Sequence, residues 1–312
     1  MADINFHQLL LFYTVARVKS FSRAAQELGV SQPAVSIQVQ ELERSLGTVL
    51  LNRKPRGVEA TEAGRTVYEY AQRIFSLTQE MQGAVDELQG LRRGRLTLGA
   101  SSTPGDFILP LIVAQFAQVH PGIQIELLIA NTATTVDRVL RRELHMGVVG
   151  EVVEDETGEL FTMPLIEDEV AFIASPRHPL AQPSYLGVGL TLEEVATAGL
   201  VMRESGSATR AAVERCLHEA GVRPQIVAEM GSNQAVKQAT AAGLGIGAVS
   251  RYGVCTEVAA GTLLVLPVKG WRCTRTFTII YLKDRHLSPV QRAFLQFLKR
   301  MAPDLAPAPV GA

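Results

Sequence analysis

Apolar residues at helical spacing predict three helices at the start of the chain. The first is expected from about Phe6 to Val18. Ser20 can cap a second helix and Gly29 can end it, because serine caps helix N-termini and glycine adopts the left-handed conformation that ends helices. Ser31 can cap a third helix that ends near Gly47. The pattern therefore predicts an all-α start to the N-terminal region.

The spacing within the second and third helices is typical of a helix-turn-helix. Counted from Phe21, a small residue stands fifth (Ala25), a glycine ninth (Gly29) and an apolar residue fifteenth (Val35). The motif needs a small residue where its helices cross, a turn residue that tolerates positive φ, and an apolar residue that pins the second helix. A generic helical hairpin is the alternative. If the segment is a helix-turn-helix, three polar residues of its third helix would face base edges in the major groove: Gln32, Ser36 and Gln38.

A strand, a basic turn and a return strand are predicted next, over residues 49–58. This hairpin is typical of a wing, and its tip would carry Arg53, Lys54 and Arg56. Such side chains contact phosphates or the minor groove, and the alternative is a solvated basic loop. Residues 1–60 therefore predict a winged helix-turn-helix that binds double-stranded DNA.

A long helix is expected from Thr61, which can cap it, to about Leu91. Its core-type positions alternate in steps of four and three residues, with Thr78 as the polar exception: Val67, Ala71, Ile74, Met81, Val85 and Leu88. Such a heptad seam indicates pairing of two chains, which would place two recognition helices over two half-sites. The alternative is an amphipathic helix packed on its own domain. Residues 92–95 (Arg-Arg-Gly-Arg) would form a hinge.

The pattern changes from Leu96, where short apolar runs begin to alternate with helical segments. Strands are predicted at 96–100, 123–129, 146–149, 170–174, 200–202, 225–228, 245–249 and 276–282. Helices are predicted at 108–119, 134–142, 208–220, 233–242 and 289–301. This alternation predicts parallel sheets with helices on both faces, which bind ligands where strands end and helices begin.

Four strand-to-helix junctions are rich in hydroxyl groups: residues 101–105, 131–135, 205–209 and 231–233. Hydroxyls and free N–H groups at helix N-termini suit a carboxylate, a phosphate or a sulfate. Each junction taken alone can be a helix cap and nothing more. Four of them on the ligand-facing edge of one fold favour a small anion site.

Composition narrows the class of protein. With 312 residues, 47% of them hydrophobic, the chain can form two or three globular domains. No apolar run approaches the roughly 18 residues that span a bilayer, so neither a membrane anchor nor a signal peptide is expected. Three widely spaced cysteines fit a reducing cytoplasm, and scattered histidines predict no metal site. Residues 1–95 hold 12 Lys/Arg against 10 Asp/Glu, a mild basic bias that is consistent with phosphate contact.

The N-terminal motifs resemble those of the LysR-type transcriptional regulators over about 65 residues. The resemblance is carried by residues 21–28 (FSRAAQEL), 31–36 (SQPAVS), 42–43 (LE), 46–47 (LG), 51–53 (LNR) and 61–64 (TEAG). The family often has an arginine directly after the serine of the recognition helix, and Ile37 stands there in this chain. The expected DNA-contacting residues are Arg23, Ser31, Gln32, Pro33, Ala34, Ser36, Gln38, Arg53 and Arg56.

The resemblance also implies a tetramer built as a dimer of dimers, and a C-terminal α/β effector domain of two lobes, like the periplasmic binding proteins. Lobe I would comprise residues 96–165 and 268–302, and lobe II residues 166–267. Residues 99–105 and 203–210 look like the branch of Calvin-cycle and sulfur-assimilation regulators. Family members place inducers between the lobes, which nominates Ser101, Ser102, Thr103, Thr132, Ser205 and Ser207. Residues 303–312, rich in Ala and Pro, would form a disordered tail.

Two other classes of protein compete with a ligand-responsive regulator. An enzyme would need a nucleophile, a metal or a phosphate-binding loop. Residues 243–247 lack the GxGxxG spacing, and Cys216 lies in a helix among apolar residues, so we expect neither a catalytic residue nor a cofactor. A solute-binding protein would fit the two-lobed domain, but not the DNA-binding segment or the missing signal peptide.

Overall fold

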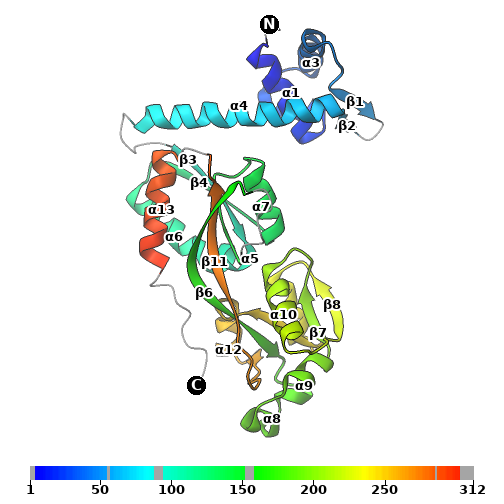
Figure 1. Ribbon diagram of the computed structural model, residues 1–312, viewed down its shortest axis with the longest axis vertical. Coiled ribbons are helices and arrows are strands. Elements are labelled where there is room, and N and C mark those ends of the chain that lie inside the picture. The colour runs from blue at the N-terminus through cyan, green and yellow to red at the C-terminus, as the bar shows by residue number, and fades with distance from the viewer. Residues whose placement is uncertain (1–3, 55–56, 88–93, 152–157, 285–286, 303–312) are drawn as a thin grey trace. The chain divides into compact units, whose positions relative to one another are not determined.

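The computed structural model of the protein describes residues 4–54, 57–87, 94–151, 158–284 and 287–302 (Figure 1). The chain divides into two compact units, Met1–Gln82 and Gly83–Ala312. Within the described residues, no helix combines the length and the apolar character needed to cross a membrane.

The N-terminal unit begins with three helices at the predicted bounds: α1 (Phe6–Val18), α2 (Phe21–Leu28) and α3 (Gln32–Leu46). Ser20 and Ser31 cap α2 and α3 through their side chains, and Gly29 ends α2 with φ of 67°. The crossing residues Ala25 and Val35 are buried, as the motif requires. Strands β1 (Leu51–Lys54) and β2 (Gly57–Ala60) form an antiparallel hairpin, so the predicted winged helix-turn-helix is confirmed.

Helix α4 (Glu62–Glu87) has two halves with different surroundings. In the first half, Ala71 is fully buried and Val67 and Ile74 pack against the core of the N-terminal unit. In the second half, Met81 is 63% exposed and Val85 is 47% exposed. The predicted seam therefore packs on its own domain up to Ile74, whereas Met81 and Val85 of its later part are exposed. Leu88 lies outside the described residues.

The C-terminal unit contains a mixed sheet with the strand order β4-β3-β5-β11-β6-β9-β7-β8, and β10 beside β6. The strands are β3 (Gly94–Ser101), β4 (Ile123–Ala130), β5 (Met146–Val149), β6 (Leu160–Ala174), β7 (Leu200–Arg203), β8 (Ile226–Met230), β9 (Ile246–Ser250), β10 (Leu264–Val265) and β11 (Cys273–Leu282). The helices are α5 (Ser102–Phe107), α6 (Leu109–Val119), α7 (Thr132–Leu140), α8 (Pro183–Val188), α9 (Leu192–Thr197), α10 (Ala208–Glu219), α11 (Asn233–Ala241), α12 (Cys255–Ala259) and α13 (Pro289–Met301). Short 3-10 turns lie at η1 (Pro179–Ala181) and η2 (Arg251–Gly253).

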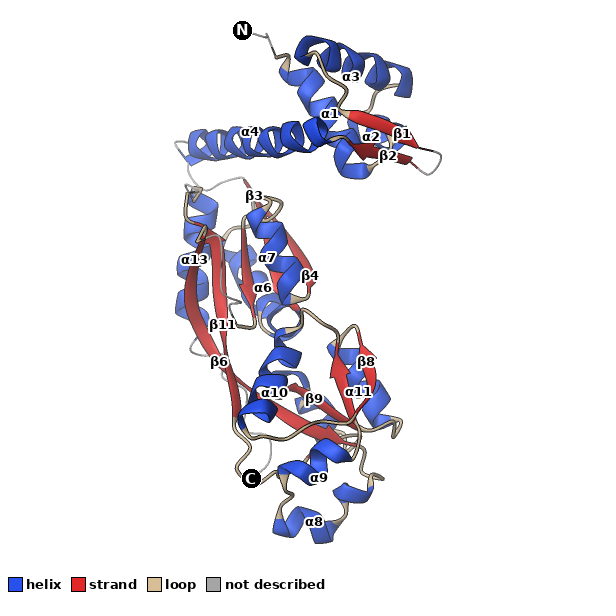
Figure 2. Ribbon diagram, turned by 45° about the vertical axis from the view of Figure 1, so that its right-hand side comes forward, coloured by secondary structure: helices blue, strands red, loops and turns tan. Residues whose placement is uncertain are grey.

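Two apolar cores divide this unit into two lobes. We name lobe I the part around Phe116 and Phe294, with β3–β5, α5–α7 and α13. Lobe II is the part around Phe172 and Leu217, with β7–β10 and α8–α12. The long strands β6 and β11 run antiparallel through both lobes and connect them (Figure 2).

Three predictions about this unit need correction. The parallel pairs β3·β4, β3·β5, β7·β8 and β7·β9 are as predicted, but β6 and β11 are antiparallel crossings. Val268, Trp271 and Cys273 pack in the core of lobe II. The chain therefore returns to lobe I later than the predicted residue 268, near the register shift between Phe277 and Thr278 in the β6·β11 pair. Gly94 and Arg95 belong to β3, because they pair with β4, and not to a hinge; residues 92–93 and the tail from 303 lie outside the described residues.

Candidate functional site

The predicted hydroxyl-rich junctions converge between the lobes. A cavity of about 10 Å³ is lined there by Ser101, Ser102, Thr103, Asn131, Thr132, Arg203, Ser207, Ala208, Thr209 and Arg275. It contains five of the six nominated effector residues. The sixth, Ser205, is exposed and is not among the lining residues. The fourth junction, 231–233, contributes Asn233, which is buried beside the cavity and bonded to Thr103.

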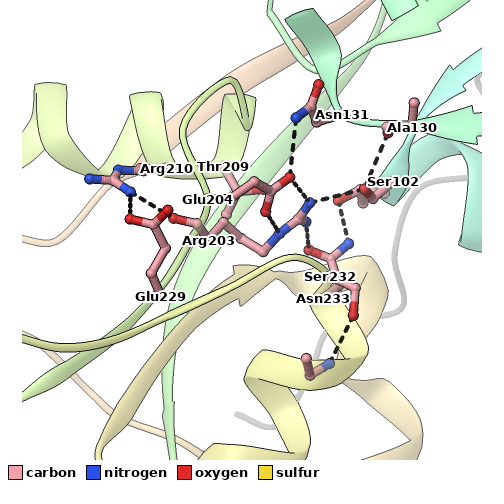
Figure 3. A network of polar contacts seen from close by, with 12 residues as sticks. Ser102, Ala130, Asn131, Arg203, Glu204, Thr209, Arg210, Glu229, Ser232 and Asn233 are labelled. Atoms are coloured by element: carbon pink, nitrogen blue, oxygen red, sulfur yellow. Dashed lines mark hydrogen bonds and ion pairs between the residues drawn. The ribbon is translucent and has the colours of Figure 1, made fainter. Parts of the chain in front are cut away.

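Arg203, at the end of β7, is the centre of the polar contacts at this site (Figure 3). Its side chain is buried, and its Nε and Nη2 donate to the two carboxylate oxygens of Glu204 at 2.8 and 2.9 Å. Nη2 also donates to Ser102 Oγ at 3.1 Å, and Nη1 donates to Asn233. One guanidinium therefore ties β7 to α5 in lobe I and to α11 in lobe II.

Arg275, near the start of β11, is a second buried cation at the cavity. Its Nε donates to Asp168 Oδ2 at 2.8 Å, and its two Nη atoms donate to Thr209 at 2.9 Å and Thr103 at 3.2 Å. Asp168 also accepts from Ser250 at 2.6 Å. Burial raises the pKa of Asp168, and the adjacent Arg275 opposes that rise. The pair fixes Arg275 where β11 passes from one lobe to the other.

Further hydrogen bonds join the two lobes. Asn131 of lobe I donates to Glu204 Oε1 at 3.4 Å, and the Ala133 N–H donates to the Gly206 carbonyl at 3.2 Å. We call these two contacts, together with Arg203–Ser102 and Asn233–Thr103, the interlobe network. Burial acts to raise the pKa of Glu204, but hydrogen bonds from Arg203 and Asn131 hold that pKa below its usual value. The Glu204 carboxylate is therefore an anion that already binds the guanidinium of Arg203.

The cavity has an unused hydrogen-bonding group and little room. Thr132 Oγ1 is buried and has no hydrogen-bond partner among the described residues. A volume of about 10 Å³ holds about one water molecule. The cavity as it stands is too small for a metabolite.

Sequence reasoning found the hydroxyls but missed both arginines. Arg203 ends an otherwise apolar strand, Leu-Val-Met-Arg, in which every residue is buried. Arg275 lies in a strand whose neighbours alternate in burial. A single cation at the end of an apolar strand was a signal that the Arg203 side chain is buried, but it did not reveal the partners that a buried arginine needs.

Most of the residues predicted to contact DNA lie on α3 or at its N-cap. Ser31, Pro33 and Ala34 are exposed at its start, and Arg23 is exposed on α2. Three further predicted residues of α3 are half-buried: Gln32, Ser36 and Gln38. Gln38 accepts a hydrogen bond from Gln8 at 3.2 Å.

The wing differs from the prediction in one respect. The Arg53 side chain is not at the tip, because its guanidinium lies 4.7 Å from the Phe21 ring centroid and donates to Ser36 Oγ. The cation–π contact with Phe21 joins β1 to α2, and the hydrogen bond to Ser36 joins β1 to the recognition helix α3. Arg56 lies outside the described residues.

Comparison with known proteins identifies both units. Residues 6–65 match the bacterial regulatory helix-turn-helix of the lysR family, and residues 89–303 match the LysR substrate binding domain. The chain belongs to the LysR family of transcription regulators. This LysR-family chain is 36% identical over 298 residues to the RuBisCO operon transcriptional regulator of Allochromatium vinosum, covering 95% of each chain. The resemblance to Calvin-cycle regulators is thereby confirmed.

Two solved structures are similar to this LysR-family chain. One is the CcmR regulatory domain of Synechocystis PCC6803 in complex with 2-PG, with a TM-score of 0.62 and 30% identity, covering 69% of this chain and all of that one. The other is full-length CbnR complexed with its target DNA, with a TM-score of 0.68 and 24% identity, covering 96% of this chain and all of that one. The family relatives are regulators and not enzymes, so this chain is a DNA-binding transcription regulator with a domain for a small metabolite.

Proposed function

We propose that a small anionic metabolite binds between the lobes at the interlobe network and modulates DNA binding. The observation that carries this proposal is the convergence of two buried guanidinium groups, Arg203 and Arg275, on a cavity lined with hydroxyls. Arginine with hydroxyl donors is well suited to carboxylate and phosphate groups. The CcmR regulatory domain, which is matched over its whole length by this chain, was solved in complex with 2-PG.

The ligand would act by changing the balance between a closed and an open arrangement of the lobes. Its entry must break the Arg203–Ser102 and Asn131–Glu204 contacts, because the closed cavity is too small. A ligand shifts this balance only as far as it binds one arrangement more tightly than the other. In the open arrangement, Arg203 would release Glu204 and bind the ligand, so the ligand would bind the open arrangement more tightly than the closed one.

We infer that DNA is contacted by the nine residues named from the sequence, through α2, α3 and the wing. The exposed second half of α4 would pair with a second copy, and dimers would pair again to form a tetramer. Half-sites of a pseudo-palindromic operator then follow from the two-fold symmetry of a dimer. Ser36 and Gln38 would exchange their contacts with Arg53 and Gln8 for bases or phosphates.

The test is a thermal-shift titration of the full-length protein with 2-PG, inorganic phosphate and sulfate. A ligand at a hundred times its Kd stabilises the folded state by about 2.7 kcal/mol, which raises the Tm by roughly 5–10 °C for a unit of this size. Thr132→Val removes the unpartnered hydroxyl while keeping the shape of the side chain. Ser205→Ala is the matched control, since Ser205 is exposed outside the cavity lining.

The expected result is a shift that Thr132→Val reduces and Ser205→Ala preserves. No shift with any anion, or a shift that Thr132→Val leaves intact, would contradict the proposed site. A gel-shift assay on the DNA flanking its own gene, with and without the active anion, then tests whether the ligand changes DNA affinity.

A further inference from the structure

The recognition helix carries an apolar ridge on its exposed face. Ile37 is 55% exposed, and Pro33 and Ala34, one helical turn earlier, are also exposed. Residues three and four apart share a face of a helix, so these three side chains are neighbours. The opposite face of α3, with Val35 and Val39, is buried in the core. Ile37 therefore does not contribute to the packing of its own domain.

Neither helix propensity nor packing accounts for isoleucine at this position. Isoleucine favours helices less than alanine, glutamine or arginine, so an exposed helical site gains nothing from it. Single exposed apolar residues are common on protein surfaces and need no explanation by themselves. Ile37 differs because it lies on α3, the helix proposed above to contact DNA.

The polar residues on either side of Ile37 are already engaged. Ser36 accepts a hydrogen bond from Arg53, and Gln38 accepts one from Gln8. Both flanking side chains are half-buried, whereas Ile37 stands out between them. Ile37 is thus an exposed side chain between two engaged ones, and it has no hydrogen-bonding group.

We propose that Ile37 specifies a thymine in each half-site by contact with its 5-methyl group. In the major groove, thymine is the base that presents a methyl group to an apolar side chain. The same contact disfavours guanine, because an isoleucine would cover the O6 and N7 acceptors without bonding to them. This inference rests on the proposed docking of α3 in the major groove.

The test begins with selection of duplexes from a random library by the full-length protein at one fixed salt concentration. Each thymine of the best duplex is then replaced in turn by deoxyuridine, which keeps base pairing and removes the methyl group. Burial of one methyl contributes about 0.8 kcal/mol, so each single replacement should lower the affinity about fourfold. Ile37→Ala removes the contact from both half-sites of a dimer, so it should bind the original duplex about fifteenfold more weakly and show no further loss with deoxyuridine.

Val49→Ala is the matched control, because Val49 is an apolar residue of the same domain with a similar exposure of 58%. It should keep the fourfold sensitivity to deoxyuridine. If Ile37→Ala keeps that sensitivity, another side chain reads the methyl group and the inference is wrong. It is also wrong if no single replacement weakens binding of the original protein. Failure to select any sequence at all would instead overturn the docking of α3, which separates the two ideas.

Discussion

The contact between Arg203 and Ser102 should contribute a measurable part of the free energy that holds the two lobes together. Arg203→Gln removes the guanidinium, and Ser102→Ala removes the acceptor, which lies on lobe I at 3.1 Å. Breaking a buried ion pair by removing one partner costs about 3 kcal/mol or more, since Glu204 then loses its cation. Ser102→Ala alone should cost about 1.5 kcal/mol, because it removes a hydrogen bond to a charged group. A hydrogen bond to a charged group contributes about 1.5 kcal/mol, so the double variant should fall short of the sum by that amount.

The assay is urea unfolding of the full-length protein, followed by the fluorescence of Trp271. This is the single tryptophan of the chain, and it packs in the core of lobe II, 4.5 Å from Phe172 between ring centroids. Its signal therefore reports the effector unit. Contacts that do not interact give coupling energies below about 0.5 kcal/mol, and a value in that range would refute the role of this contact.

A control cycle uses a pair at the protein surface. Arg95 donates to Glu126 at 2.7 Å, and the two side chains are 64% and 40% exposed. Exposed ion pairs contribute about 1 kcal/mol or less, so Arg95→Gln with Glu126→Gln should give a smaller coupling than the Arg203–Ser102 cycle. A surface coupling equal to the interlobe one would show that burial adds nothing at Arg203.

Three other predictions follow from the structure. Glu204→Gln removes the internal anion from Arg203, so calorimetry should show about tenfold tighter binding of the active anion; unchanged or weaker binding would contradict competition by Glu204. Burial raises the pKa of Tyr252 to about 12, against about 10 in an unfolded chain, so the unfolded state loses this proton first and stability is lost as the pH rises from about 10 toward 12. Urea midpoints across that range should fall less steeply with pH for Tyr252→Phe than for the original protein. Equal slopes would show that Tyr252 does not cause the loss of stability. Met81→Glu places a charge on the exposed half of α4 and should reduce the oligomer to smaller species by light scattering, whereas Thr66→Glu, at an exposed polar position of the first half, should not. An unchanged mass for Met81→Glu would rule out pairing through this surface.

Local signals explain which elements could be predicted from the sequence. The bounds of α1, α3 and α13 follow from caps and apolar spacing, and these elements agree with the prediction to within a residue. Strand β6 was predicted only at 170–174, although it begins at Leu160. Three consecutive acids, Glu167, Asp168 and Glu169, interrupt its apolar pattern, and pairing with β11 supplies the missing stability. Tertiary pairing overrides local preference in such strands.

The residues of the candidate site could also be predicted only in part. Hydroxyls at strand ends could be recognised because the topology of alternating strands and helices brings those ends together. Arg203 and Arg275 could not be assigned, because their role depends on partners 30 to 172 residues away in the chain, such as Asn233 and Thr103. Arg53 was placed at the wing tip for a related reason, since only the folded hairpin brings it over Phe21.

The two crossings of β6 and β11 also set the order in which the effector unit can fold during synthesis. Lobe II is nearly continuous in the chain, so its core can close once Cys273 has emerged from the ribosome. The core of lobe I must wait for β11 and α13, because Phe116 packs against Phe294 and Phe297 from the last helix. Domains fold as units during translation, from the N-terminus onward. A nascent chain that stops before residue 289 would thus carry a finished DNA-binding unit together with an open, apolar lobe I, the kind of surface that proteases and chaperones recognise.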